Sequence, residues 1–207
     1  MEILNDSRIE YIDIFDGNHI HKQPTLHDQV DVFITRYRYE SLLAFTDGAV
    51  TEFGRGSSAV VLLPLEVGVP EVEVKQLHAT LMSSLETEIA AIVLAMEQAV
   101  MYLEDNAGKS MTKQCKLIIL SDCKSAIKCI LRRSVVHHFH VLMSRVRSSA
   151  CALRDWNIRI ALAWIPFQVT LIQWRRVHWS RLGLGPTFNP AGRARSGQVR
   201  LFSRLLP

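Results

Sequence analysis

The stretch "LLAFTDGAVTEFGRG", residues Leu42–Gly56, decides the predicted fold. Its first half is an apolar run typical of a strand, which leads directly into Asp47 and then into a glycine-bearing segment. Two further runs rich in apolar residues follow at short intervals, so three strands are expected: Ser41–Thr46, Ser57–Leu63 and Glu71–Leu77. Because short connections join antiparallel neighbours, these strands predict a meander.

The hydrophobic period changes after the third strand. From Ser83 to Asn106, apolar residues recur at three- and four-residue steps, which indicates an amphipathic helix, and Ser83 with Glu86 forms a capping box at its start. The remaining predicted elements are a strand at Cys115–Asp122, helices at Ser125–Leu131 and Val135–Leu153, and a strand at Ile158–Pro166. Helical crossovers imply parallel pairing. The sequence therefore predicts an α/β fold with a five-stranded mixed sheet: an antiparallel meander, then parallel strands 4 and 5, with helices on the faces.

Three carboxylates interrupt this pattern. Asp47 follows the first strand, and an Asp-Gly hairpin turn is the alternative interpretation. Glu88 borders the apolar stripe of the long helix, where a boundary residue can also reach out to water. Asp122 ends a buried strand, where ligand sites of α/β sheets gather, but a helix N-cap explains it equally well.

Taken together, the three residues predict a metal site. A strand, a helix and a strand end can bring their side chains together above one sheet. Converging carboxylates repel one another unless cations bind. Carboxylate oxygens favour hard ions such as Mg²⁺. Two such ions about 4 Å apart support hydrolysis of a phosphodiester. Asp47, Glu88 and Asp122 are thus the candidate catalytic and metal-binding residues.

Four motifs resemble ribonuclease H domains, most closely those of non-LTR retrotransposon reverse transcriptases: "FTDGAV" (45–50), "ETEIAAIVLAM" (86–96), "LSDCKSAI" (120–127) and "IALAWIP" (160–166). The resemblance implies a ribonuclease H-like fold and an endonuclease that cleaves the RNA strand of RNA–DNA hybrids with two Mg²⁺ ions, Mn²⁺ being a possible substitute. It also implies that Asp47, Glu88 and Asp122 match the first three metal ligands of the family.

Other residues have weaker signals. Lys124 and Lys128 flank a helix and either contact the backbone of the hybrid or form a solvated face. Ser57, with Ser58, is a further candidate for nucleic-acid binding. Trp164 is expected to be a packing residue.

Charged residues are distributed unevenly between the body of the chain and its C-terminal tail. Residues 1–166 carry 17 basic and 20 acidic residues, whereas 167–207 carry seven Arg and no acid. We expect an N-terminal extension or linker (1–40), a ribonuclease H-like domain (41–166) and a basic tail (167–207). The family's fourth Asp has no counterpart in this tail, whose composition suggests either translation in a shifted reading frame or a basic arm that binds phosphates.

Two alternative functions remain open at this stage. A catalytically inactive remnant that binds nucleic acid is favoured by the missing fourth Asp. An integrase-like nuclease is disfavoured because Glu88 precedes Asp122, whereas that group has the order Asp, Asp, Glu. The charged N-terminus and the lack of a long apolar run predict an intracellular protein, cytoplasmic or nuclear, without a membrane partner. A place within a larger retroelement polyprotein is also expected from the resemblance.

Overall fold

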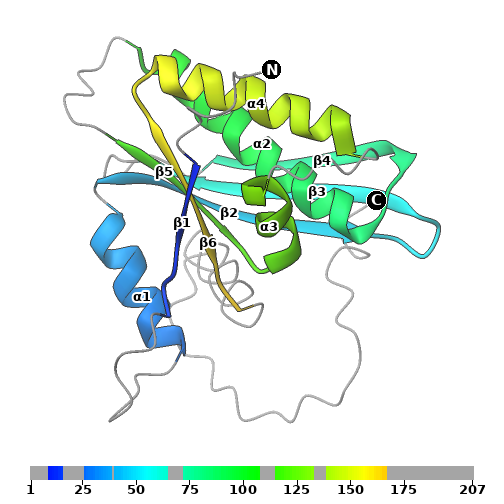
Figure 1. Cartoon of the computed structure of the whole chain (residues 1–207), viewed down its shortest axis with the longest axis horizontal. Coiled ribbons are helices and arrows are strands. Elements are labelled where there is room, and N and C mark those ends of the chain that lie inside the picture. Colours follow the sequence, from blue (N-terminus) through cyan, green and yellow to red (C-terminus); the bar gives the residue numbers. More distant parts are fainter. Residues whose placement is uncertain are drawn as a thin grey trace, which may run out of the picture. The chain divides into compact units, whose positions relative to one another are not determined.

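The structure is a computed structural model that describes residues 9–15, 26–38, 40–64, 72–107, 115–132 and 139–166. Its centre is a six-stranded sheet with the order β1-β6-β5-β2-β3-β4 (Figure 1). The strands are β1 (Ile9–Ile12), β2 (Ser41–Val50), β3 (Arg55–Leu63), β4 (Val72–Leu81), β5 (Lys116–Ser121) and β6 (Arg159–Trp164).

The predicted meander is present. β2 pairs antiparallel with β3, and β3 pairs antiparallel with β4. β2 is longer than expected, because Asp47 and Gly48 pair with Ala59 and Ser58 inside the ladder. The chain turns only at Thr51–Gly54, where Gly54 has a positive φ of 74°. The alternative of an Asp-Gly turn at Asp47 is therefore wrong.

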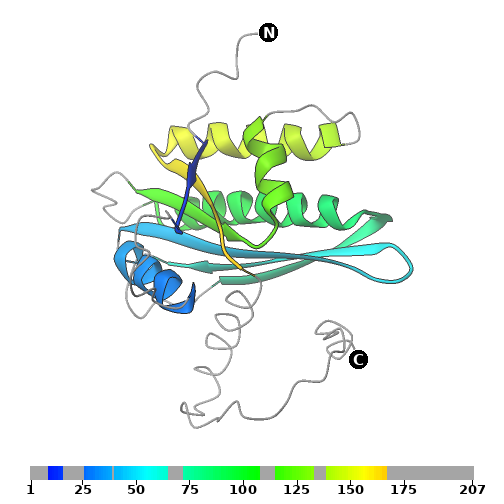
Figure 2. The ribbon, with the colours of Figure 1, turned by 60° about the horizontal axis from the view of Figure 1, so that its bottom comes forward.

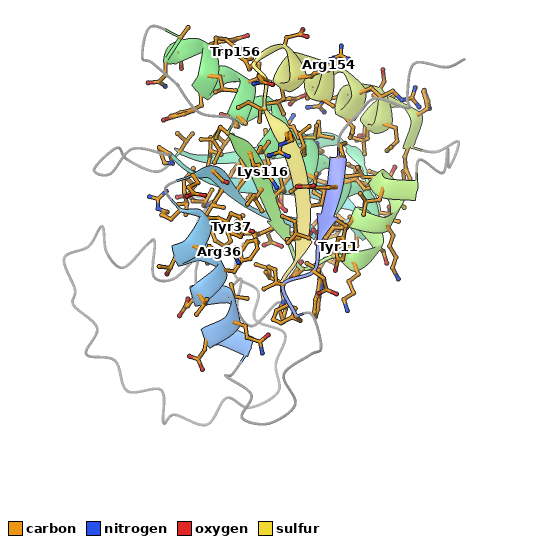
Figure 3. All side chains as sticks on the ribbon, turned by 60° about the vertical axis from the view of Figure 1, so that its left-hand side comes forward. Tyr11, Arg36, Tyr37, Lys116, Arg154 and Trp156 are labelled. Carbon is orange, nitrogen blue, oxygen red and sulfur yellow. The ribbon has the colours of Figure 1, made fainter. Side chains whose placement is uncertain are left out.

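The other half of the sheet is parallel. β5 pairs with β2 on one side and with β6 on the other, as the crossovers predicted. β1 adds a sixth strand by pairing parallel with β6, so the prediction of five strands was one short. Lys116 of β5 also forms an ion pair of 2.7 Å with Glu10 of β1, and Figure 3 labels this lysine on the sheet.

Helices cover both faces of the sheet (Figure 2). α2 (Ser84–Asp105), α3 (Lys124–Arg132) and α4 (His140–Asp155) lie on one face, and α1 (Leu26–Tyr37) lies on the other. Both hydrogen bonds of the predicted capping box at Ser83 and Glu86 are formed. α2 packs across β2 and β3, and its buried side chains form the core with apolar residues of β2, β3, β5 and β6.

Some predicted boundaries were short or long by a few residues. β4 continues four residues past Leu77, beyond an irregularity in the β3 register between Arg55 and Ser57. β1 and α1 arise in the region that the sequence assigned to an extension or linker. The predicted tail, 167–207, lies outside the described residues. None of the described helices is both long and apolar enough to cross a membrane.

Candidate metal centre

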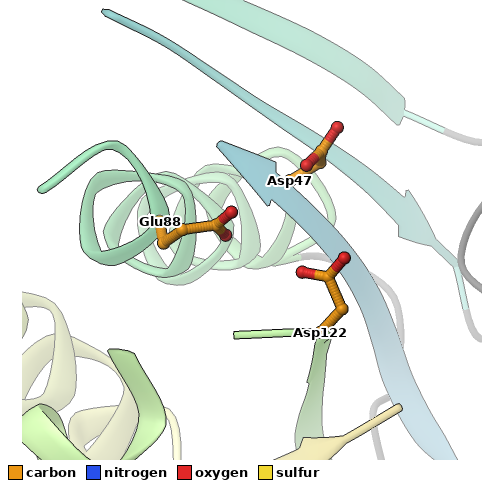
Figure 4. Close-up of side chains that lie close together, drawn as sticks. All are labelled: Asp47, Glu88 and Asp122. Carbon is orange, nitrogen blue, oxygen red and sulfur yellow. The ribbon is translucent and has the colours of Figure 1, made fainter. Parts of the chain in front are cut away.

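Asp47, Glu88 and Asp122 meet near one end of the central strands β2 and β5 (Figure 4). One carboxylate oxygen from each lies within 4.8 Å of the others. Glu88 is only 8% exposed, while Asp47 and Asp122 are half-buried. Oxygens this close are within reach of one shared cation. The structure thus brings together the three residues that the sequence singled out, although their catalytic role remains a prediction.

The two aspartates converge because β2 extends beyond the point where its pairing with β5 ends. β5 pairs with β2 only as far as Phe45 and Leu120, and β2 then continues alone on that side. Asp47 therefore stands on a free strand edge, and Asp122 follows directly after the end of β5. Parallel neighbours place these positions at the same end of the sheet.

Glu88 reaches the two aspartates because Gly48 has no side chain. A Cβ added to Gly48 would lie 2.5 Å from the backbone nitrogen of Glu88 and 2.6 Å from the carbonyl carbon of Thr87. Any larger residue would push the first turn of α2 off the strand. A glycine inside a strand often marks such a close backbone approach, which is the sequence signal that predicts this contact.

A buried hydroxyl also holds this turn of α2. Ser58 of β3 is 1% exposed and donates a 2.8 Å hydrogen bond to the carbonyl of Thr87. Its single proton is used there, so the Ser58 oxygen accepts the 2.9 Å bond from Nε2–H of His78 on β4. The residue before Glu88 is thereby tied to two strands of the sheet.

Burial raises the pKa of all three carboxylates, and repulsion between them adds to the shifts of Glu88 and Asp47. Burial raises the pKa of Glu88 to about 8, and the charges of Asp122 and Asp47 add to this shift. The pKa of Asp47 is raised to about 6 by burial and then by Asp122, while a hydrogen bond from the Gly48 backbone acts in the opposite direction. Burial also raises the pKa of Asp122. Among the residues that the structure describes, no cationic group contributes to these three shifts.

The donor set fits a hard divalent cation. Glu88 Oε2 is a buried side-chain oxygen with no hydrogen-bond partner, and among the described residues it is the one such atom. Buried polar atoms without a partner are costly and therefore rare. All three donors are carboxylates, which suit Mg²⁺ or Mn²⁺ better than softer metals. A cation among the three carboxylates would supply the missing partner.

The remaining predicted site residues lie on α3 and β3. Lys124 and Lys128 are exposed and lie one turn apart on α3. Ser57 is half-buried and pairs with Ala49, on the face of β2 that carries Asp47. Ser58 is buried within the fold, so it is not available to a nucleic acid. The alternative in which Glu88 reaches out to water is wrong, because burial encloses that side chain.

Comparisons with known proteins give structural matches alone. No family profile matches the chain, and no curated protein does. An RNase H1 from the archaeon Halobacterium salinarum is 14% identical, with a TM-score of 0.47 over 63% of this chain and 89% of that one. The N-terminal RNase H domain of a Mycobacterium tuberculosis protein is 16% identical, with a TM-score of 0.49 over 63% and 91%.

A foamy viral protease-reverse transcriptase, solved with an RNA/DNA hybrid, is 10% identical, with a TM-score of 0.43 over 78% of this chain and 20% of that one. The strand order and pairing of the present chain define its own architecture: an antiparallel meander of β2, β3 and β4, followed by parallel β5 and β6, with α2, α3 and α4 on one face. The chain has a ribonuclease H-like fold.

Proposed function

We propose that the chain is a metal-dependent endonuclease that hydrolyses the RNA strand of RNA–DNA hybrids. The observation that carries the proposal is the cluster of Asp47, Glu88 and Asp122, with its buried and unpartnered Glu88 oxygen. The ribonuclease H-like fold and the four sequence motifs support the choice of substrate. Recognition of the hybrid would rest on its shape, phosphates and 2′-hydroxyls rather than on base edges.

Each carboxylate has a defined part in this proposal. Asp47 would hold cations from a strand that the sheet fixes, Asp122 from the turn directly after β5, and Glu88 from near the start of α2. The chemistry that Mg²⁺ supplies at such a site is activation of a water and stabilisation of the departing oxygen. Lys124 and Lys128 would contact phosphates of the hybrid from α3, and Ser57 would do so from β3.

The parent protein is a further part of the proposal. The motifs favour a retroelement origin, and the domain would then belong to a larger polyprotein that includes a reverse transcriptase. The charged N-terminus favours an intracellular site of action. Sequencing the locus upstream tests whether the domain belongs to such a polyprotein. Translating all frames past codon 166 tests whether the tail is read in a shifted frame. A reverse transcriptase reading frame and an Asp-containing helix in another frame are expected.

The activity test compares the wild-type chain with Asp47→Asn. The purified proteins are incubated with Mg²⁺ and a duplex whose RNA strand is end-labelled, beside matched double-stranded DNA and double-stranded RNA. We expect cleavage of the hybrid and not of the other two duplexes. This cleavage should be slow, because residues 156–207 include no Asp or Glu to serve as a fourth carboxylate. Loss of a metal ligand should reduce the rate by roughly 10³-fold in the variant.

The alternative is a catalytically inactive module that binds nucleic acid. It is favoured by the same absence of acidic residues after Asp155. Equal and negligible cleavage by the wild type and by Asp47→Asn, with retained binding of the hybrid, would establish this alternative. Rapid wild-type turnover would instead overturn the expectation of weak activity.

A further inference from the structure

The main chain at Asp122 lies beyond the ladder of the sheet. The last pair between β5 and β6 joins Ser121 to Trp164, and the pairing of β5 with β2 ends one residue earlier, at Leu120. Asp122 therefore needs other contacts to keep its carboxylate in the cluster. A residue at such a place is free to rotate its peptide unless a side chain holds it.

Trp164 supplies that contact. This last residue of β6 donates a 3.0 Å hydrogen bond from its indole Nε1–H to the carbonyl oxygen of Asp122. Two other hydrogen bonds stabilise the same turn, from the Ile165 nitrogen to the Ser121 carbonyl at 3.0 Å and from the Cys123 nitrogen to Ser121 Oγ at 3.1 Å. The first of these acts on the neighbours of Asp122. The Cys123 N–H belongs to the same peptide as the Asp122 carbonyl, so Ser121 Oγ and the indole hold that peptide together.

The ring of Trp164 is itself held in place. Phe15 packs edge-on against it with 5.6 Å between centroids, and the ammonium of Lys124 lies 3.7 Å from the ring centroid. A lysine over an indole is an attractive cation–π contact. These two neighbours fix the plane of the ring and hence the direction in which its N–H points.

We propose that Trp164 is a positioning residue for the metal centre: its indole N–H fixes the main chain of Asp122 and thereby the position of that carboxylate. The sequence predicted only a packing role for this residue. Hydrogen bonds that orient metal ligands commonly change metal affinity by 10- to 100-fold when they are removed. The proposal rests on the proposed function, because it assumes that the three carboxylates bind a divalent cation.

The test uses Mn²⁺ as the probe, titrated into the full chain and followed by electron paramagnetic resonance. Trp164→Phe keeps an aromatic ring beside Phe15 and Lys124 but removes the donor. We expect its Kd for Mn²⁺ to rise about 10-fold. Trp156→Phe is the matched control, since Trp156 follows the end of α4 and is 37% exposed (Figure 3). Its Kd should stay within about twofold of the wild type.

A double variant shows whether the effect passes through Asp122. In an Asp122→Asn background, Trp164→Phe should change the remaining Mn²⁺ affinity by less than about twofold, because the ligand being positioned is already lost. A full additional loss in that background, or an unchanged Kd in the single variant, overturns the proposal. Should Trp164→Phe fail to fold, replacing Trp164 with benzothienylalanine removes the N–H from a ring of nearly the same shape.

A metal-free measurement separates this inference from the proposed function. Hydrogen exchange of the Cys123 amide reports whether the turn after β5 stays ordered. We expect faster exchange at Cys123 in Trp164→Phe than in the wild type and no change in Trp156→Phe. If the wild type binds no Mn²⁺ while this difference persists, the proposed metal function fails but the indole still holds Asp122. If the exchange rates are equal, the positioning role is wrong.

Discussion

Two glutamates of α2 have opposite surroundings. Glu97, in the middle of the helix, accepts two hydrogen bonds from Arg145 of α4, at 2.9 and 2.7 Å. Glu88, near the start of the helix and nine positions earlier, is buried beside Asp47 and Asp122 and leaves one oxygen without a partner. The same helix therefore carries one carboxylate whose two oxygens both accept hydrogen bonds from the chain and another with a buried oxygen that accepts none.

The difference separates a structural carboxylate from a candidate ligand. Glu97 and Arg145 join two helices at a partly exposed interface, where an ion pair contributes little to stability. Glu88 is enclosed with two like charges, an arrangement that lowers the stability of the metal-free protein whenever the group is ionised. An external cation would reverse that effect at Glu88 alone, so changes at the two positions should have opposite consequences.

The largest effect is expected from Glu88→Gln compared with Glu97→Gln. Glu88→Gln removes a metal ligand, so hybrid cleavage should fall by roughly 10³-fold, while the metal-free protein at pH 8 gains on the order of 1 kcal/mol or more in unfolding free energy. Glu97→Gln should leave cleavage unchanged and lower stability by up to about 1 kcal/mol. Cleavage assays and urea denaturation at fixed pH measure both quantities.

The comparison breaks if the two variants behave alike. A loss of stability in metal-free Glu88→Gln at pH 8 would mean that the ionised carboxylate has a stabilising partner in the folded chain. Equal loss of cleavage in both variants would mean that helix packing, and not ligand identity, limits activity.

The next effect is the dependence of the metal-free protein's stability on pH. In the folded chain the pKa values are about 8 for Glu88 and about 6 for Asp47, above their ordinary values of 4.5 and 3.8. The folded protein thus retains protons that the unfolded chain releases as the pH rises. As far as these two groups determine it, the stability of the metal-free protein is greatest below pH 4 and declines until about pH 8, by several kcal/mol in total.

Thermal unfolding at pH 5 and pH 8 measures this decline. Mg²⁺ should raise the melting temperature more at pH 8 than at pH 5, because cations compete with protons for the same oxygens. In Glu88→Gln both the decline and the response to Mg²⁺ should shrink. A metal-free protein that becomes more stable between pH 5 and pH 8 would contradict the shifts at these two carboxylates.

The sequence predicted the parts of the fold that depend on local patterns. The capping box at Ser83 and the period of α2 involve neighbours along the chain, and both are present. β1 was not predicted because its four residues alternate only loosely and pair with β6, about 150 positions away. Nothing in the local sequence indicates that partner.

The same reasoning applies to the site. Asp47, Glu88 and Asp122 stood out because each breaks an apolar pattern that its own segment establishes. The contacts of Trp164 with Asp122 and of Arg145 with Glu97 could not be predicted, since each joins residues more than 40 positions apart. Ser58 was predicted, with Ser57, to contact a nucleic acid, whereas its side chain is buried and bonds to the Thr87 carbonyl of α2.

The smallest effect on stability and metal affinity is expected from a change at Ser58. This serine contacts α2 next to Glu88 and far from Glu97. Ser58→Ala removes the hydrogen bond to the Thr87 carbonyl and the acceptor of His78, so stability should fall by about 1 kcal/mol. Because the turn that carries Glu88 loosens, Mn²⁺ affinity should also fall, by roughly threefold. Ser149→Ala, at a buried serine of α4, is the control and should leave Mn²⁺ affinity unaltered. Equal Mn²⁺ affinity in both variants would show that Gly48 and the capping box position Glu88 without help from Ser58.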